Sequence, residues 1–454
     1  MSNTDSVRPP ISQEKSGYSV RQVNNSDKHE VAMPHQEDVY IQHDKEASSI
    51  ITYDEEQIEH APEGTAGPLK ALYMLLKSFI GTGVIFLPGS FVNGGLVVST
   101  VLMVVIAIIC TYSFHALVQS QRTVGGSYGN VAQVLYGRWM RYFIDFSLCL
   151  SQMGFVSSYF IFISSNIGVA VRSLNDGYEP FDSKYYIWLI LLIIAPFTWA
   201  RKLNKLAPLV ALAEIFIAFG LICVVYFSSR EISQSGLGPG IVMANSKDFA
   251  LMIGTAVFAF EGIGMVVPVV EAMKEPEKFP RVLNLGMIIS TVVFTFIGLI
   301  GYLAYGENTA SNVVTNFPAE PLSVAVQILY AVAIISSAPF MLYPAVTITE
   351  RGLYGPNQSG RISWRYKWMK NFTRSLIPIV CACVSFGVGA SNLDKFVSLV
   401  GSVACMPLCF IYPGLFHYKT SPGKYTRPLD IVLVIFGIAI LIYTLYINVN
   451  SWIN

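Results

Sequence analysis

Four ionisable side chains stand within stretches that are otherwise apolar enough to cross a membrane. They are Lys77, Asp145, Glu214 and Glu261. An ionisable group near the centre of a membrane helix costs about 2.5–3.5 kcal/mol on insertion scales, so each requires a reason. A carboxyl group in an apolar pocket can take up a proton, and an ammonium–carboxylate pair can join two helices. Proton binding inside the membrane is therefore the first chemistry that these residues indicate.

Glu261 is the best placed of the four, because it adjoins an interruption of its helix. The segment FEGIGMVVP (260–268) has two glycines and a proline directly after this glutamate. An earlier segment, FIGTGVIFLPG (79–89), repeats that order of glycines and proline. Each glycine weakens a helix by roughly 1 kcal/mol relative to alanine, and proline removes a backbone donor. Both segments are therefore predicted to be breaks in membrane helices.

The elements that carry these residues are long apolar stretches. The 454 residues are 53% hydrophobic and only 13% charged, whereas soluble domains carry about 25% charged residues. Continuous stretches of about 20 apolar residues predict transmembrane α-helices and not the short alternating strands of a barrel. The sequence predicts an all-α polytopic membrane protein with eleven spans, at about 70–91, 95–119, 141–170, 185–200, 206–228, 249–271, 283–305, 321–349, 372–390, 393–417 and 430–448.

Charge gives the orientation and separates the first 69 residues from the rest. Alternate loops hold 18 Lys and Arg residues on one side of the predicted membrane and five on the other. The positive-inside rule places the first set, and the N-terminus with it, in the cytoplasm, and the C-terminus on the far side. Residues 1–69 have five basic and thirteen acidic residues without apolar period. We expect a disordered acidic cytoplasmic tail there, followed by a transmembrane domain over 70–454.

The two predicted breaks fall in the first and the sixth span. The sixth span comes five places after the first, and because five is odd the two halves have opposite orientation in the bilayer. The sequence thus predicts an inverted repeat, 70–228 and 249–417, with an extra helix at 430–448. Interrupted helices at matching places in inverted halves are typical of the central site of a secondary transporter.

The chemistry of such a site follows from its backbone. A half-helix that begins within the membrane presents free N–H groups and a positive dipole end, which suit a carboxylate. Unwound carbonyl groups suit a cation or an ammonium group. A small zwitterion such as a free amino acid satisfies both, whereas simple packing kinks would not need both glycines and a proline in both halves.

Two segments, KSFIGTGVIFLPGSFVNGG and FAFEGIGMVVPVVEAMKEPEKFP, resemble the amino acid/auxin permease family. The similarity is to the fungal vacuolar amino-acid exporters and to the animal proton-coupled amino-acid transporters. It implies a LeuT-type fold with a 5+5 inverted repeat and an eleventh helix. It also implies proton-coupled movement of neutral amino acids, from the vacuolar lumen to the cytoplasm. The coupling histidine of the animal members aligns with Met74 here, so proton coupling must use another group.

These arguments give the candidate site residues. The expected substrate-binding residues lie at the two breaks and, by resemblance, on the third span: Ile80, Gly81, Thr82, Gly83, Tyr159, Phe258, Phe260, Glu261 and Gly262. The two phenylalanines would form an apolar wall or gate. Proton coupling is assigned to Glu261, with Lys77 and Glu214 expected to pair because they lie at matching depths. Ser336 and Ser337, in the middle of the eighth span, are a possible ion site.

Other functions compete with proton-coupled transport. A membrane enzyme would need clustered catalytic or metal-binding groups, and the sequence has no HExxH motif. We expect no enzyme activity, cofactor, metal or nucleic-acid partner. The expected partners are neutral amino acids, protons and the lipid bilayer, with a monomer as the working unit. Two alternatives of the same fold stay open: a sodium-coupled amino-acid importer that uses the serine pair, and an amino-acid sensor.

Overall fold

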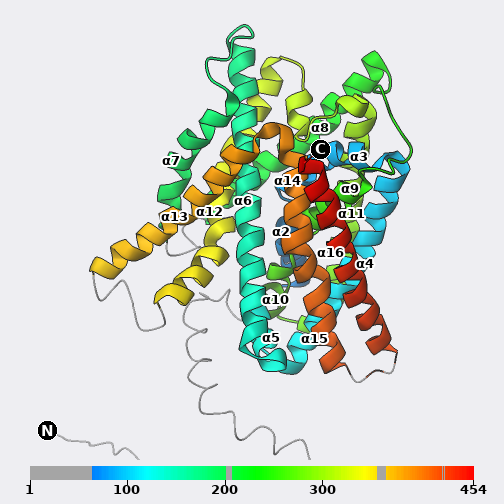
Figure 1. The fold of residues 1–454 in the computed structure, drawn as a ribbon, viewed down its shortest axis with the longest axis vertical. Helices are drawn as coiled ribbons and strands as arrows, with labels where there is room; N and C mark the ends of the chain where they lie inside the picture. Colours follow the sequence, from blue (N-terminus) through cyan, green and yellow to red (C-terminus); the bar gives the residue numbers. More distant parts are fainter. Residues whose placement is uncertain (1–63, 201–206, 355–363, 422, 424, 454) are drawn as a thin grey trace, which may run out of the picture. The chain divides into compact units, whose positions relative to one another are not determined.

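The computed structural model describes residues 64–200, 207–354, 364–421, 423 and 425–453. Within these ranges the regular secondary structure is helical, apart from one isolated bridge between Ala66 and Met273, and short loops join the helices (Figure 1). The predicted acidic tail lies outside the described residues except for its last few. The first half contains α2 (Pro68–Phe79), η1 (Thr82–Phe86), α3 (Leu87–Gly94), α4 (Leu96–Val124), α5 (Tyr128–Tyr136), α6 (Arg138–Leu174), α7 (Tyr186–Thr198) and α8 (Ala207–Ser235). The second half contains α9 (Phe249–Ala259), α10 (Ile263–Ala272), α11 (Phe279–Tyr305), α12 (Pro321–Tyr354), α13 (Trp364–Val388), α14 (Leu393–Val400), η8 (Gly401–Cys405), η9 (Pro407–Ile411) and α15 (Tyr412–Thr420), and α16 (Thr426–Ile453) follows.

The helix lengths agree with the predicted spans. Nine stretches of the described residues are long and apolar enough to cross a membrane. The pair Pro68–Phe79 and Gly83–Gly94, bent by 43°, forms a further, broken span. The shorter apolar stretch Ser183–Thr198 occupies the position of the predicted fourth span. Most of these helices are apolar on more than one face, because one side meets lipid and the other the protein core.

The two broken helices lie against each other. The half-helix α3 packs on α9, and α2 packs on α10, so each half of one broken helix contacts a half of the other. The most extensive packing between two helices joins α6 with α12, as expected for corresponding helices of two repeats. These two helices are the third and eighth spans. The last helix, α16, packs on α15 and η9 and lies beside α4 in the view of Figure 1.

The first break starts where α2 ends at Phe79. The Ile80 N–H still bonds to the Leu76 carbonyl at 2.7 Å, and the Gly81 N–H then turns to the Phe79 carbonyl at 2.9 Å. Gly81 is extended, with φ −114° and ψ −146°, so the helix cannot continue through it. The chain resumes in the 3₁₀ turn η1, and Pro88 stands in the first turn of α3. Proline is tolerated there because the first turn has no intrahelical acceptor for its N–H.

The second break is shorter than its glycine–proline segment. It comprises Phe260, Glu261 and Gly262, after α9 ends at Ala259 and before α10 begins at Ile263. The Glu261 N–H reaches the Phe258 carbonyl at 3.3 Å, which tightens the last turn of α9. Pro268 lies inside α10. The glycine beside Glu261, and not the proline, therefore defines the second interruption.

Candidate functional site

A pocket lies where the two breaks meet α6 and α12. Its cavity volume is about 20 Å³, which has room for about one water molecule. Its lining comes from the first broken helix (Ser78, Phe79, Gly81 and Gly83), the second (Phe258, Ala259 and Glu261), α6 (Phe155 and Tyr159) and α12 (Met341). Five of the predicted substrate-binding residues are thus brought to one cavity: Gly81, Gly83, Tyr159, Phe258 and Glu261.

Glu261 is the charged residue of this lining. Only 6% of its surface is exposed. Across the described residues, no side chain or backbone group gives its carboxyl a hydrogen bond or an ion pair. An ionised carboxylate cannot be buried at low cost without a partner, so this group requires a proton or a cationic ligand.

The three glycines at the breaks have different surroundings. A Cβ atom on Gly81 would enter open space beside the pocket, with no atom within 4 Å. A Cβ atom on Gly83 would lie 3.3 Å from the Ala259 Cα, so this glycine allows the two breaks to approach closely. A Cβ atom on Gly262 would overlap the Phe79 ring. Gly81 thus leaves backbone accessible to a ligand, whereas Gly83 packs tightly on Ala259 and Gly262 leaves no room for a side chain beside Phe79.

Of the two phenylalanines predicted to form an apolar wall, Phe258 lines the pocket and Phe260 does not. The Phe258 ring lies 4.4 Å, centre to centre, from that of Phe155, and both line the pocket. Phe260 is fully buried against Phe294 of α11, with ring centres 5.2 Å apart. It points away from the cavity because residues two apart at the end of a helix, such as Phe258 and Phe260, face nearly opposite sides. Ile80 and Gly262 border the breaks without lining the pocket, and the side chain of Thr82 lies outside the described part of the structure.

Lys77 and Glu214 form the contact that their matching depths predict. Lys77 Nζ lies 2.9 Å from Glu214 Oε1, which joins α2 to α8. The Tyr73 hydroxyl donates to the other carboxylate oxygen, Oε2, at 2.9 Å. The two side chains are 26% and 22% exposed and do not line the pocket, although Ser78 beside Lys77 does. Their part in proton coupling stays a prediction.

The serine pair of α12 is not part of the pocket lining. The Ser336 hydroxyl donates to the Val332 carbonyl at 2.8 Å, and the Ser337 hydroxyl to the Ala333 carbonyl at 2.9 Å. Both bonds stay within the helix, as is usual for serine in membrane helices. The nearest pocket residue on this helix is Met341, one turn further on. A sodium site at these serines stays a prediction.

Sequence reasoning missed some of the lining. Phe155 lies one helical turn before Tyr159 and thus shares its face, so the spacing of α6 was a usable signal. Ser78 and Phe79 directly precede the first break, so their position in the sequence was also sufficient to predict them as lining residues. Met341 had no signal, because its place depends on how α12 packs against α6.

A chain of membrane-length helices, two of them broken where they meet at one pocket, has the architecture of a secondary transporter. The fold is similar to the inward-facing conformation of Mhp1, with a TM-score of 0.59 at 14% identity over 87% of this chain and 92% of that one. It is also similar to MhsT in complex with L-phenylalanine, with a TM-score of 0.52 at 11% identity over 85% and 99%. Both have the LeuT-type fold, so the predicted fold class is confirmed. Residues 64–449 match the family described as "Transmembrane amino acid transporter protein", and the chain belongs to this family.

Curated relatives of the chain occur in fungi and plants. It is 36% identical to vacuolar amino acid transporter 4 of Saccharomyces cerevisiae, over 91% of this chain and 62% of that protein. It is 36% identical to vacuolar amino acid transporter 3 of Schizosaccharomyces pombe, over 85% of this chain and 58% of that protein. It is 28% identical to amino acid transporter AVT3C of Arabidopsis thaliana, over 80% and 85%. The chain thus spans about 60% of the length of these fungal relatives. The predicted family is confirmed, and this family is one of transporters and not of enzymes.

Proposed function

We propose that this protein is a secondary active transporter that moves neutral amino acids together with protons from the vacuolar lumen to the cytoplasm. The observation that carries the proposal is the unpartnered carboxyl of Glu261, buried in a pocket between two broken helices. Membership of an amino-acid transporter family and the names of the vacuolar relatives support the class of substrate and the membrane.

The ends of the half-helices favour a zwitterion. The helix α10 begins beside the pocket, so its first N–H groups and positive dipole end suit a substrate carboxylate. The helices α2 and α9 end there, and their last carbonyls suit an ammonium group. Gly81 permits close approach to the backbone, and the rings of Phe155 and Phe258 offer an apolar surface to an uncharged side chain.

Glu261 would couple the proton to the substrate. With the site open to an acidic lumen, its carboxyl takes up a proton, and the neutral form suits the apolar lining. A bound substrate lies beside the same carboxyl, so the proton and the substrate influence each other's binding. After reorientation, substrate and proton leave together toward the cytoplasm. The empty carrier then returns with Glu261 deprotonated.

The contact between Lys77 and Glu214 would serve as a gate beside the pocket. It ties α2, the first half of a broken helix, to α8, and the residue next to Lys77 lines the cavity. A pair that is about one quarter exposed can break and reform at moderate cost. Opening toward the cytoplasm would separate the two side chains.

The proposed topology follows the distribution of basic loops. The N-terminus and the α4–α6, α10–α11 and α15–α16 connections face the cytoplasm, and the C-terminus faces the lumen. The monomer is the proposed working unit, because the pocket is complete within one chain.

The test is uptake into proteoliposomes under an imposed pH gradient, with a panel of twenty amino acids. Wild type should concentrate neutral amino acids when the gradient is present, and should not require sodium. Glu261→Gln should lose pH-driven accumulation and the pH dependence of flux, but keep exchange of one amino acid for another. An unchanged flux-versus-pH curve in this variant would reject Glu261 as the proton site. Binding without flux would favour the sensor, and a requirement for sodium would favour the sodium-coupled importer.

A further inference from the structure

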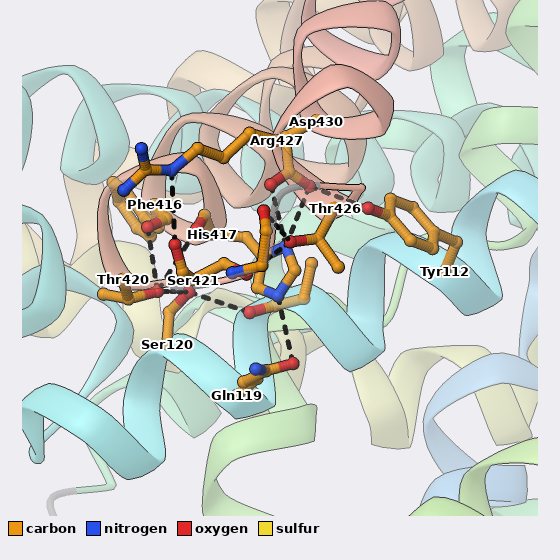
Figure 2. A network of polar contacts seen from close by, with 12 residues as sticks. Tyr112, Gln119, Ser120, Phe416, His417, Thr420, Ser421, Thr426, Arg427 and Asp430 are labelled. Carbon is orange, nitrogen blue, oxygen red and sulfur yellow. Dashed lines mark hydrogen bonds and ion pairs between the residues drawn. The ribbon is translucent and has the colours of Figure 1, made fainter.

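A second buried group of ionisable side chains joins three helices away from the pocket (Figure 2). His417 of α15 faces Asp430 of α16, with Nδ1 at 2.8 Å from Oδ1 and 2.9 Å from Oδ2. The Tyr112 hydroxyl of α4 donates to Asp430 Oδ1 at 2.8 Å. The side chains of His417 and Asp430 are 4% and 0% exposed. Local sequence patterns do not predict this pairing, because the two residues meet only when α15 and α16 pack together.

The hydrogen bonds that the imidazole can make depend on its protonation state. Nδ1 faces the Asp430 carboxylate, and Nε2 lies 3.0 Å from Oε1 of Gln119 on α4. When both partners are acceptors, both ring nitrogens must donate, and that is the protonated imidazolium. A neutral ring keeps only one of these bonds, unless the Gln119 amide turns to offer its NH₂ group. Gain or loss of one proton therefore changes the contact between α15 and α4.

The same stretch of α4 also contacts the second broken helix. Gln121 Nε2 lies 3.5 Å from Glu271 Oε1 of α10, and the Arg122 guanidinium donates to the Pro276 carbonyl at 2.6 Å. These residues are two and three positions after Gln119, so one turn of α4 bonds α15 on one side, and α10 and the turn that follows it on another. A change at His417 can thus reach the half-helix that begins at the pocket.

Other ionisable groups around the pair are bonded elsewhere. Those on α4, α5, η9, α15 and α16 are His115 (Nε2 to Asn284 Oδ1), Tyr128 (to the Leu408 carbonyl), Tyr136 (to the Leu415 carbonyl), Cys409 (beside Cys110), Tyr412 (to Ser147), Tyr418 (under the Arg427 guanidinium), Lys419 (to the Leu135 carbonyl) and Arg427 (to the Ser421 carbonyl). Within the described residues, His417 and Asp430 are therefore each other's charge partner, and the Tyr112 hydroxyl is hydrogen-bonded to Asp430. Histidine is the side chain that changes charge between pH 5 and 8.

We propose that His417 and Asp430 form a second proton site. This pair, the latch, responds to the pH on the side of the membrane where the α15–α16 connection lies, and it controls the movement of α4 with α10. With His417 protonated, all its bonds are made and α4 is held, so opening on this side is slow. With His417 neutral, the bond to Gln119 is lost unless the amide turns, so this contact is weaker and opening is faster. In the proposed topology this side is the cytoplasm. The inference rests on the proposed function in taking α10 as a moving part of the transport cycle.

The test is amino-acid exchange in proteoliposomes with equal pH on both faces, between pH 6 and 8. The labelled probe is the amino acid best transported in the panel described above. The rate is measured in wild type and in Glu261→Gln, each with and without the double change His417→Gln and Asp430→Asn. The double change keeps hydrogen-bonding groups and removes the titrating pair. We expect at least about a twofold rise with pH in the Glu261→Gln background, and no such rise once the pair is replaced.

Two further variants decide the outcome. His115→Gln, which removes the other histidine of this region, should keep the rise, whereas Gln119→Met should exchange fast at every pH because the latch cannot close. The proposal is overturned if the doubly changed protein keeps the rise, if Gln119→Met behaves as its parent, or if the parent shows no rise. Should the double variant fail to fold, Gln119→Met alone decides. Loss of pH-driven accumulation in Glu261→Gln concerns the proposed function only, so the two failures are distinguishable.

Discussion

Glu261 and Asp430 are both buried carboxyl groups, yet their surroundings are opposite. Asp430 is fully covered and receives bonds from His417 and Tyr112. Glu261 lines a pocket and, among the described residues, has no partner at all. A buried charge is stable only when it is paired and hydrogen-bonded. The comparison teaches that Asp430 contributes to the fold through its partners, whereas Glu261 is maintained at a cost that only a ligand or a proton can offset.

Removing each carboxyl should therefore have opposite effects on stability. Asp430→Ala leaves His417 and Tyr112 without their acceptor, and we predict a loss of about 3–5 kcal/mol in the free energy of unfolding. Glu261→Gln removes an uncompensated buried group, so stability should be unchanged or higher while pH-driven transport is lost. The stability of both variants is measured by unfolding in detergent, with the loss of monodisperse protein as the readout. Equal destabilisation by the two changes would break the comparison.

A pair at intermediate burial should fall between these extremes. Lys77→Met leaves Glu214 with only the Tyr73 hydroxyl, and because the pair is partly exposed we predict a loss of about 1–2 kcal/mol. The combination of Lys77→Met with Glu214→Gln should recover most of that loss. The double-mutant cycle is measured by the same unfolding assay. Additive losses would show that the two side chains do not interact energetically.

The glycines of the first break sharpen the distinction between a ligand site and a packing site. Gly81→Ala adds a methyl group to open space, so we predict about tenfold weaker substrate binding at unchanged stability. Gly83→Ala is the matched control, since its methyl group presses on Ala259 and should lower stability as well. Binding is measured by displacement of a labelled amino acid, and stability by thermal unfolding. Unaltered affinity in Gly81→Ala would place the substrate elsewhere.

The fold could be predicted from sequence further than the site could. Apolar length, the alternation of basic loops and two glycine–proline segments were sufficient for the membrane helices and the two breaks, because lipid imposes these patterns locally. Depth along a helix, at a fixed rise per residue, also placed Lys77 opposite Glu214. The direction in which a side chain points around its helix was harder to predict. Phe260 packs against α11, whereas Phe258 lines the pocket. The pairing of His417 with Asp430 depends on the packing of three helices, which no local pattern encodes.

A fourth carboxyl, outside the membrane-spanning segments, gives the smallest expected effect. Glu320 forms a two-bond pair with Arg230, at 2.8 and 2.6 Å, and the guanidinium lowers the pKa of this carboxyl. Because the pKa is lower in the folded state, the pair stabilises the protein above the ordinary carboxyl range, and the contribution is lost as pH falls through the lowered value. We predict that Glu320→Gln lowers the midpoint of thermal unfolding slightly and equally at pH 7 and pH 6, and that the difference from wild type vanishes only below the ordinary carboxyl range. The pair is solvent-exposed, so raised salt should reduce the difference. A difference that disappears already near pH 6 would mean that the carboxyl is not held in its charged form, and Glu320 would then resemble Glu261 and not Asp430.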